Sequence, residues 1–202
     1  WDEAYEREIS NFDEHGDVGE IWFGENSLNQ MVKCVTKMNG VQKDSSILDL
    51  GTGNGVTCIE LAKLGYSNIL GVDYSAQAIN LAKKIAENEG VQVNFDVDDI
   101  LNSQLKSKFR VVLDKGTFDA ISLSDSKQQN QQTYINTLKQ VLDDPKEGYP
   151  TYFLITSCNF TKEELLTLFH EFAYHSEIKY PTIKFGGKSG STIVSIVFVK
   201  KP

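Results

Sequence analysis

The stretch DLGTGNG (49–55) decides the fold of this 202-residue chain. A short apolar run, 45–50, leads into it, and apolar residues recur at helical spacing in the segment that follows, 56–65. Glycines at such a junction let the backbone turn tightly and approach a ligand, and the next helix presents free N–H groups. Their spacing differs from the G-x-G-x-x-G dinucleotide fingerprint. The stretch therefore predicts a ligand-binding loop between a strand and a helix.

Strand-like and helix-like segments alternate after this loop, which is typical of a parallel sheet covered by crossover helices. Ser75 is the expected N-cap of one helix, and Thr161 with Glu164 predicts a capping box for another. The polar run 127–132 is expected to be a loop or a first helical turn. The sequence predicts strands at 68–73, 91–98, 109–116 and 152–159, and helices at 75–90, 131–144 and 161–172.

The end of the chain breaks this alternation. Two strand-like segments, 176–185 and 191–201, are joined by the glycine-rich run GGKSG (186–190), which leaves no room for a helix. The sequence therefore predicts parallel strands followed by a C-terminal antiparallel hairpin.

Composition narrows the classes of function. The net charge of −8 and the pI near 4.9 argue against a general nucleic-acid binder, and a basic or neutral partner fits better. The three cysteines form no zinc-binding pattern, and no apolar run approaches the roughly 20 residues that cross a bilayer. The N-terminal residues lack the basic and apolar regions of a signal peptide. We expect a single cytoplasmic domain with no metal and no membrane or direct nucleic-acid contact.

Acidic residues follow successive expected strands, at the carboxyl edge where ligands of such sheets gather. Asp73 ends the second strand about twenty residues after the loop, where a carboxylate can accept hydrogen bonds from both ribose hydroxyls. Asp73 could equally be the cap of the next helix, and NAD enzymes share this acid. Asp114 and Lys115 close the fourth strand. An exposed strand-end lysine is the plain alternative for Lys115.

The glycine loop resembles motif I of class I S-adenosylmethionine-dependent methyltransferases, and Asp73 with Tyr74 resembles their motif II. The parallel strands with a closing hairpin are similar to the Rossmann-like, mostly parallel seven-stranded sheet of that class, which carries helices on both faces. Rarer phrases, EIWFG (20–24), DKGTFDAI (114–121) and ITSCNFTKEEL (155–165), resemble the lysine methyltransferases that act on translation elongation factor 1-alpha. This group includes methyltransferase-like ten and its yeast counterpart.

The resemblance spans almost the whole chain and implies one methyltransferase domain, with 1–44 as a helical, substrate-side segment and 45–202 as the cofactor-binding core. It implies that Asp49 lies near the amino-acid moiety of S-adenosylmethionine and that Asp99 meets the adenine amino group. Asp98 competes for that role, and a solvated acidic turn is the alternative. The implied cofactor-binding residues are Trp22, Asp49, Gly51, Thr52, Gly53, Gly55, Asp73, Tyr74, Asp99, Ile100, Asp114 and Lys115.

Lysine methylation also implies an acceptor channel. The target amine must lose a proton before it attacks the methyl group, and an apolar channel favours the neutral amine. The candidate channel residues are Trp22, Phe23, Phe118 and Phe160, for which ordinary core packing is the alternative. Asp114 and Asn159 are the candidates for catalysis, as groups that orient the amine or the cofactor.

Three other functions stay open from the sequence. A small-molecule methyltransferase usually adds a lid of helices, for which this chain has little spare length. A catalytically silent methyltransferase-like module commonly has eroded cofactor motifs, and these are intact. An NAD-dependent oxidoreductase is disfavoured by the glycine spacing and by the closing hairpin.

Overall fold

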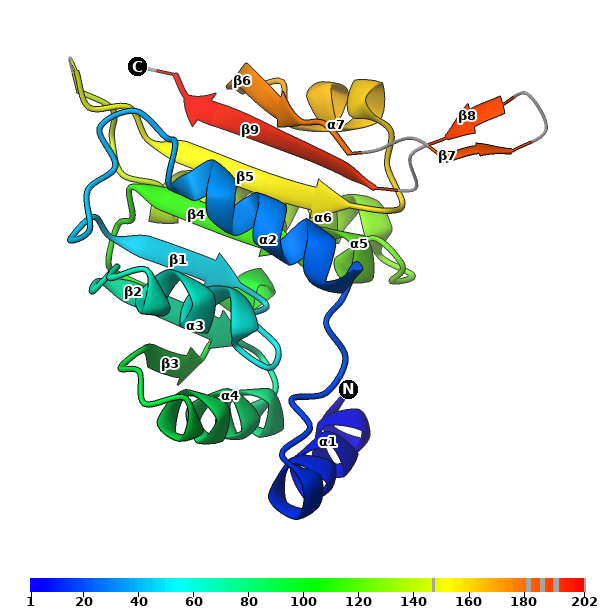
Figure 1. Ribbon diagram of the computed structural model, residues 1–202. Coiled ribbons are helices and arrows are strands. Elements are labelled where there is room, and N and C mark those ends of the chain that lie inside the picture. Colours follow the sequence, from blue (N-terminus) through cyan, green and yellow to red (C-terminus); the bar gives the residue numbers. More distant parts are fainter. Residues whose placement is uncertain (147, 181–182, 186–187, 191–192, 202) are drawn as a thin grey trace.

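The computed structural model describes residues 1–146, 148–180, 183–185, 188–190 and 193–201. A seven-stranded sheet runs through the centre of the molecule, with helices on both sides (Figure 1). The strands are β1 (Ile47–Leu50), β2 (Ile69–Asp73), β3 (Asn94–Val97), β4 (Val111–Lys115), β5 (Tyr152–Ser157), β6 (Phe172–Ile178) and β9 (Val194–Lys200), and a separate two-stranded ribbon holds β7 (Ile183–Phe185) and β8 (Lys188–Gly190).

The strand order is β3-β2-β1-β4-β5-β9-β6. The first five strands in this order are parallel, and β9 lies antiparallel between β5 and β6. The helices are α1 (Asp2–His15), α2 (Gly24–Val35), α3 (Val56–Lys63), α4 (Ala76–Asn88), α5 (Thr117–Ile121), α6 (Lys127–Val141), α7 (Lys162–Leu168) and the 3-10 turn η1 (Ile100–Asn102). The predicted mostly parallel α/β fold, with an antiparallel C-terminal pair, is confirmed.

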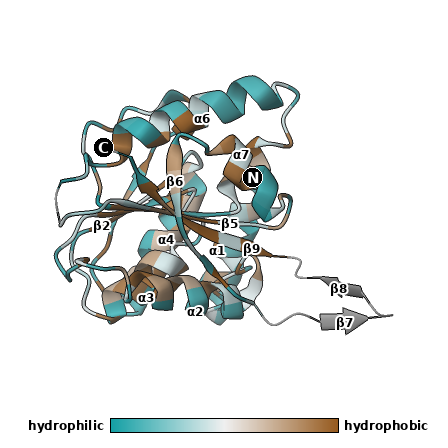
Figure 2. Ribbon diagram, turned by 90° about the horizontal axis from the view of Figure 1, so that it is seen from above, coloured by the Kyte–Doolittle hydropathy of each residue, from teal (hydrophilic) through white to brown (hydrophobic). Residues whose placement is uncertain are grey.

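Each face of the sheet has its own apolar core. Successive side chains of a strand point to opposite faces, so Ile47 packs in the core under α2, α3 and α4, whereas Leu48 packs in the core under α6 and α7. Figure 2 looks along the sheet and shows these helix layers on its two sides, with α6 and α7 on one side and α2 and α3 on the other. Crossover helices on both faces explain why β1 and β5 are buried along their whole length rather than alternating between buried and exposed residues.

The C-terminal region differs from the predicted single hairpin. The helix predicted at 161–172 ends at Leu168, and Phe172 already belongs to β6. The predicted first hairpin strand, 176–185, is divided between β6 and β7, and the ribbon β7–β8 lies between β6 and β9 in the chain. Gly186 and Gly187, the first residues of the predicted turn, lie outside the described residues. The antiparallel pairing itself, β6 with β9, agrees with the prediction.

The start of α7 was predicted correctly, and the start of α6 only in part. The capping box of α7 is present, since the Thr161 hydroxyl accepts from the Glu164 N–H at 3.2 Å and the Glu164 carboxylate accepts from the Thr161 N–H at 2.8 Å. Helix α6 begins at Lys127, so the polar run 127–132 is helical. No helix among the described residues is long and apolar enough to cross a membrane.

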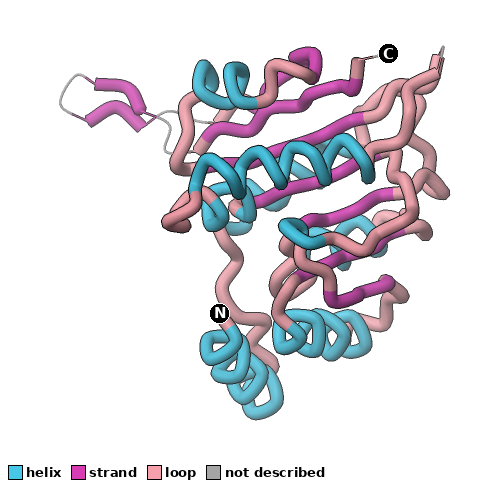
Figure 3. The backbone as a smooth tube through the Cα atoms, turned by 180° about the vertical axis from the view of Figure 1, so that it is seen from behind, coloured by secondary structure: helices cyan, strands magenta, loops and turns pink. Residues whose placement is uncertain are grey.

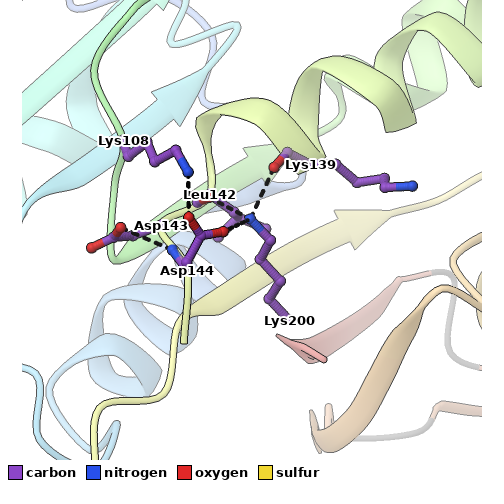
Figure 4. Close-up of polar contacts among 6 residues, drawn as sticks. All are labelled: Lys108, Lys139, Leu142, Asp143, Asp144 and Lys200. Carbon is purple, nitrogen blue, oxygen red and sulfur yellow. Dashed lines mark hydrogen bonds and ion pairs between the residues drawn. The ribbon is translucent and has the colours of Figure 1, made fainter. Parts of the chain in front are cut away.

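A cluster of lysines and aspartates closes the edge of the sheet where β4 and β5 begin (Figure 4). The Lys200 ammonium donates to the carbonyl oxygens of Lys139 and Leu142 at the end of α6, and to Asp144 Oδ1 at 2.9 Å. Lys108 holds the other oxygen of Asp144 at 2.5 Å. The two lysines lower the pKa of Asp144 to about 2. A cation at a helix C-terminus meets carbonyls that have no partner within the helix, so Lys200 fastens the end of α6 to β9.

Candidate active site

A cavity of about 460 Å³ lies at the opposite edge, where the parallel strands end. This size is within the usual range for small-molecule sites, roughly 300–1,000 Å³. Helix α1 covers part of it, beside α4 and apart from α2, as Figure 3 shows from behind. The cavity is lined by Trp1, Ala4, Tyr5, Glu8, Glu20, Trp22, Gly51, Thr52, Gly53, Asn54, Val72, Asp73, Tyr74, Asp98, Asp99, Ile100, Leu101, Lys115, Gly116, Thr117, Ala120 and Ile121.

The glycine loop forms the floor of the cavity between β1 and α3. Gly53 has a positive φ of 56°, and a Cβ there would lie 2.9 Å from the Tyr5 hydroxyl of α1. Gly51 is more tightly packed, because its Cβ would lie 2.0 Å from the Thr117 hydroxyl oxygen. Gly55 does not line the cavity and instead lets α3 approach β3 and α4. Only the first two glycines therefore offer backbone to a ligand.

Asp73 lies at the end of β2 and lines the cavity, although its side chain is largely buried. Its Oδ2 accepts from the Gly53 N–H at 3.0 Å, which joins it to the glycine loop, and its Oδ1 accepts from the Ser75 N–H. The cap of α4 is Ser75, whose hydroxyl accepts from the Ala78 N–H. Asp73 is therefore not the helix cap and is available to a ligand. Tyr74, which is 54% exposed, lies beside it.

Two acids compete at the β3 end of the cavity. Asp99 caps η1, since its Oδ1 accepts from the Leu101 N–H at 2.9 Å. Asp98 accepts from the Gln104 N–H through Oδ1, whereas its Oδ2 is buried and has no hydrogen-bond partner within the described part of the chain. A buried acceptor without a partner is costly. Both acids and Ile100 line the cavity, and Asp98 Oδ2 is a buried acceptor available to a ligand.

Asp49 lies beneath the cavity rather than in its wall. Its Oδ2 accepts from the Thr52 hydroxyl at 2.7 Å, and the Cys58 thiol lies 3.5 Å away. Burial raises the pKa of Asp49 to about 6. The family resemblance implies that Asp49 lies close to a ligand. In the structure Thr52 lies between Asp49 and the cavity, so that Asp49 holds the glycine loop from below.

The end of β4 places its two charged residues on opposite faces. Lys115 lines the cavity, and its ammonium donates to the Trp22 carbonyl at 3.3 Å. Burial lowers the pKa of Lys115, although Asp49 and Asp114 oppose that change. Asp114 points away from the cavity and is fully buried. Its carboxylate accepts from the N–H groups of Thr117 and Phe118 and from the Tyr134 hydroxyl at 2.6 Å.

Asp114 was predicted to contact the amine or the cofactor. In the structure it lies away from the cavity, and its carboxylate instead fixes the start of α5. Phe118 is also fully buried, with its ring centroid 5.0 Å from those of Tyr134 and Phe169, so it belongs to the core and not to an open channel. Phe118 therefore packs in the core, which was the alternative to a place in the acceptor channel.

Trp22 and Phe23 form an aromatic wall at the β4 end of the cavity. The Trp22 ring lies 5.1 Å from that of Trp1 and 6.2 Å from that of Phe23. Phe23 has a φ of 65°, the one positive value found at a non-glycine residue in the described part of the chain. A Cβ on Gly116 would lie 3.1 Å from Phe23 Cζ, so the two aromatics close over a bare stretch of backbone.

The other two predicted residues lie on the loop after β5, outside the cavity wall. Asn159 is exposed, and Phe160 is half-buried with its ring 5.3 Å from Phe118. The Lys127 ammonium lies 5.5 Å from the Phe160 ring centroid on the outer side. The structure thus brings together most of the predicted cofactor set but places Asn159 and Phe160 on a neighbouring surface.

Comparison with known proteins gives the family. A family model described as a methyltransferase domain matches residues 41–187. The human protein named EEF1A lysine methyltransferase 2 is 48% identical over 99% of this chain and 84% of its own length. The chain belongs to the methyltransferase-domain family. The Saccharomyces cerevisiae protein-lysine N-methyltransferase EFM4 is 38% identical over all of this chain and 92% of its own length.

The fold of this methyltransferase also has a solved counterpart. The N-methyltransferase NodS of Bradyrhizobium japonicum, solved with S-adenosyl-L-homocysteine, has a TM-score of 0.71 and covers all of this chain and 98% of its own. At 15% identity it bears on the fold alone.

Sequence reasoning missed the part of this methyltransferase site that comes from the N-terminus. Tyr5 and Glu8 of α1 line the cavity, and Glu8 accepts from the Glu20 N–H at 3.3 Å. Asn54 in the glycine loop donates to the carbonyls of Val18 and Glu20, which ties the 17–22 segment to the cavity floor. The similarity of EIWFG (20–24) to family members was a signal, although it gave this segment no position.

Proposed function

We propose that this chain transfers methyl groups from S-adenosylmethionine to a lysine of translation elongation factor 1-alpha. The observation that carries the proposal is the 48% identity, across nearly the full chain, with a protein named EEF1A lysine methyltransferase 2. The cavity supports it, because the acids, glycines and aromatics expected around the cofactor are gathered at one edge of the sheet. The proposal includes a cytoplasmic location and the division into a substrate-side segment, 1–44, and a cofactor-binding core, 45–202.

The cavity suits a nucleoside bearing an amino-acid tail. Asp73, at the middle of the cavity, can accept hydrogen bonds from two ribose hydroxyls while Gly53 N–H holds it in place. Asp98 Oδ2 is a free buried acceptor for an exocyclic amine, with Asp99 beside it and Ile100 as an apolar neighbour. Gly51, Gly53 and Lys115 lie at the β4 end of the cavity. There the amino-acid tail of the ligand would meet the glycine backbone, and its carboxylate would meet the Lys115 ammonium.

When bound, S-adenosylmethionine supplies an activated methyl group on a sulfonium, and the protein supplies alignment. Trp22 and Phe23 form an apolar wall next to Gly116, and a lysine side chain passing this wall is favoured in its neutral form, the form able to attack. The Lys115–Trp22 hydrogen bond fixes the wall to β4. Asn159 remains the candidate for orienting the amine from the surface, and Asp114 acts through α5 rather than by contact.

The charge of the chain also suits this partner. The cavity is lined by five acidic residues: Glu8, Glu20, Asp73, Asp98 and Asp99. The ammonium of Lys115, which also lines the cavity, donates a hydrogen bond to the Trp22 carbonyl. A negative cleft attracts a cationic side chain and its basic surroundings. This is the electrostatic setting that an exposed substrate lysine would meet.

The direct test is transfer of labelled methyl groups from S-adenosylmethionine to purified elongation factor 1-alpha. We expect label in the elongation factor with the wild-type chain and at least tenfold less with Asp73→Ala, because that carboxylate contacts the cofactor. Asp96→Ala is the matched control, since Asp96 is an exposed acid of β3 outside the cavity. Label on other proteins but not on this one would overturn the substrate.

The cofactor is tested separately by thermal denaturation with each candidate. A ligand that binds only the folded state raises the melting temperature. We expect a rise with S-adenosylmethionine and with S-adenosylhomocysteine. A rise with NAD and none with S-adenosylmethionine would make the chain an oxidoreductase.

A further inference from the structure

Another buried carboxylate, Asp119, lies on α5 outside the cavity wall. It is only 3% exposed, and within the described residues its side chain hydrogen-bonds to no residue of the cavity. Its Oδ1 accepts from the Ser157 hydroxyl at 2.5 Å, and its Oδ2 accepts from the Cys158 N–H at 2.8 Å. These charge-assisted bonds join α5 to the end of β5.

Ser157 extends the same network into the turn that follows β5. Its hydroxyl oxygen accepts from the N–H groups of Asn159 and Phe160, both at 3.1 Å, while it donates to Asp119. Ser157 is fully buried. One carboxylate and one hydroxyl thus satisfy three successive backbone N–H groups, and the turn 158–160 is fixed in one conformation relative to α5.

The turn lies on the acceptor side of the cavity. The cavity extends over β3, β2, β1 and the end of β4, and β5 is the next strand in the sheet. Lys115 pairs with Thr156, and the Gly116 N–H donates to the Thr156 carbonyl at 3.1 Å. Gly116 is also the backbone under Phe23. A chain that approaches the Trp22–Phe23 wall from the β5 side meets the exposed residues Cys158 and Asn159.

We propose that Asp119 and Ser157 are positioning residues for the protein acceptor, which they serve by clamping the turn 158–160 to α5. The proposal rests on the proposed methyltransferase function. The clamp holds Asn159 at a fixed place at the end of β5, the strand next to the one that ends at the aromatic wall, so that the substrate segment carrying the lysine docks with its amine aligned. Because misplacement of a reacting group by about 1 Å can cost about 100-fold in rate, a fixed turn matters for transfer and not for cofactor binding.

The test compares Asp119→Ala and Ser157→Ala with wild type, using elongation factor 1-alpha as substrate. We expect kcat/KM for methyl transfer to fall about tenfold or more in each variant, with the Kd for S-adenosylmethionine within about twofold of wild type. The double variant should lose little more than either single one, because both act on one turn. Asp125→Ala, which removes an exposed acid of the loop after α5, is the matched control and should keep wild-type kcat/KM.

Amide hydrogen exchange gives a readout that does not depend on activity. In Ser157→Ala the N–H groups of Asn159 and Phe160 lose their acceptor, so their exchange should speed up by about tenfold while α6 and β4 keep wild-type protection. Asp119→Asn, which retains one acceptor oxygen, should fall between alanine and wild type in transfer. This gradation separates a clamp from a general loss of folding.

Several outcomes would overturn the clamp. These are wild-type kcat/KM in both alanine variants, equal losses of transfer and cofactor affinity, or unchanged exchange at residues 159 and 160. A wild-type chain that binds S-adenosylmethionine but methylates no protein contradicts the proposed function instead, and the exchange result then still decides whether the clamp exists.

Discussion

At the scale of single residues, Trp22 lines the cavity and belongs to the proposed acceptor wall. Its ring packs on Trp1 and Phe23, and its carbonyl accepts from Lys115. Because the side chain is only half-buried, Trp22→Ala should lower the free energy of unfolding by about 1 kcal/mol or less, and should lower kcat/KM by at least tenfold.

Steady-state kinetics and urea unfolding measure the two effects. Tyr174→Ala, an exposed aromatic of β6, is the control for removing a ring from the surface. A folded Trp22→Ala variant with wild-type activity would remove Trp22 from the site.

Asp114 should make stability depend on pH. Burial raises the pKa of Asp114 to about 7, well above the usual aspartate value of about 3.9. Between these two values the folded protein keeps a proton that the unfolded chain releases. The stabilisation that protonated Asp114 gives the folded state is therefore lost as pH rises through this range, and the free energy of unfolding falls. Asp114→Asn lacks this titration, so its stability relative to wild type should improve by more than about 1 kcal/mol from about pH 4 to about pH 8. Urea midpoints that shift in parallel for both proteins would contradict this.

The acids also show what the sequence could predict. Asp73 was identified correctly as a strand-end acid at the cavity, because strand order alone brings it there. Asp114 was grouped with it on the same argument. Strand alternation separates the two residues at the end of β4, since Lys115 faces the α2 side with Leu113 whereas Asp114 faces the α6 side with Val112. Applying that alternation to DKGT would have placed Lys115 at the cavity and Asp114 behind it.

At the scale of elements, Lys200 and the end of α6 offer a test away from the site. Lys200→Met removes a donor to two α6 carbonyls and to Asp144, and should lower the free energy of unfolding by about 1 kcal/mol without changing kcat. Lys108→Met removes only an exposed partner of Asp144, so its effect should be below about 0.5 kcal/mol. Equal losses in the two variants would mean that the ion pair, and not the helix end, carries the stability.

The elements were predicted unevenly. Most strands and helices of the parallel half were predicted because apolar periodicity and caps coincide there, as at Ser75, whereas the short helix α5 was not predicted. The boundaries of the C-terminal elements were predicted wrongly, because the segment 176–185 was taken as one strand although Pro181 lies within it. Pairing of distant strands decides the boundaries in such a region, and the sequence pattern does not record it.

At the scale of the whole molecule, one edge of the sheet holds the cavity and the opposite edge holds the Lys200–Asp144 cluster. Six separate segments meet at the cavity: α1, residues 20–22, the glycine loop, the end of β2, the end of β3, and the segment from the end of β4 into α5. The sequence predicted five of them, since each follows a strand or carries a family phrase. It did not predict that α1 covers the cavity, because an amphipathic helix does not indicate its packing partner.

The most direct test of the central claim is mass spectrometry of elongation factor 1-alpha after incubation with the chain and S-adenosylmethionine. We predict that one lysine gains one or more methyl groups with the wild-type chain, and that the same lysine is unmodified with Asp73→Ala. An elongation factor of unchanged mass, in the presence of a wild-type chain whose melting temperature rises with S-adenosylmethionine, would contradict the claimed substrate.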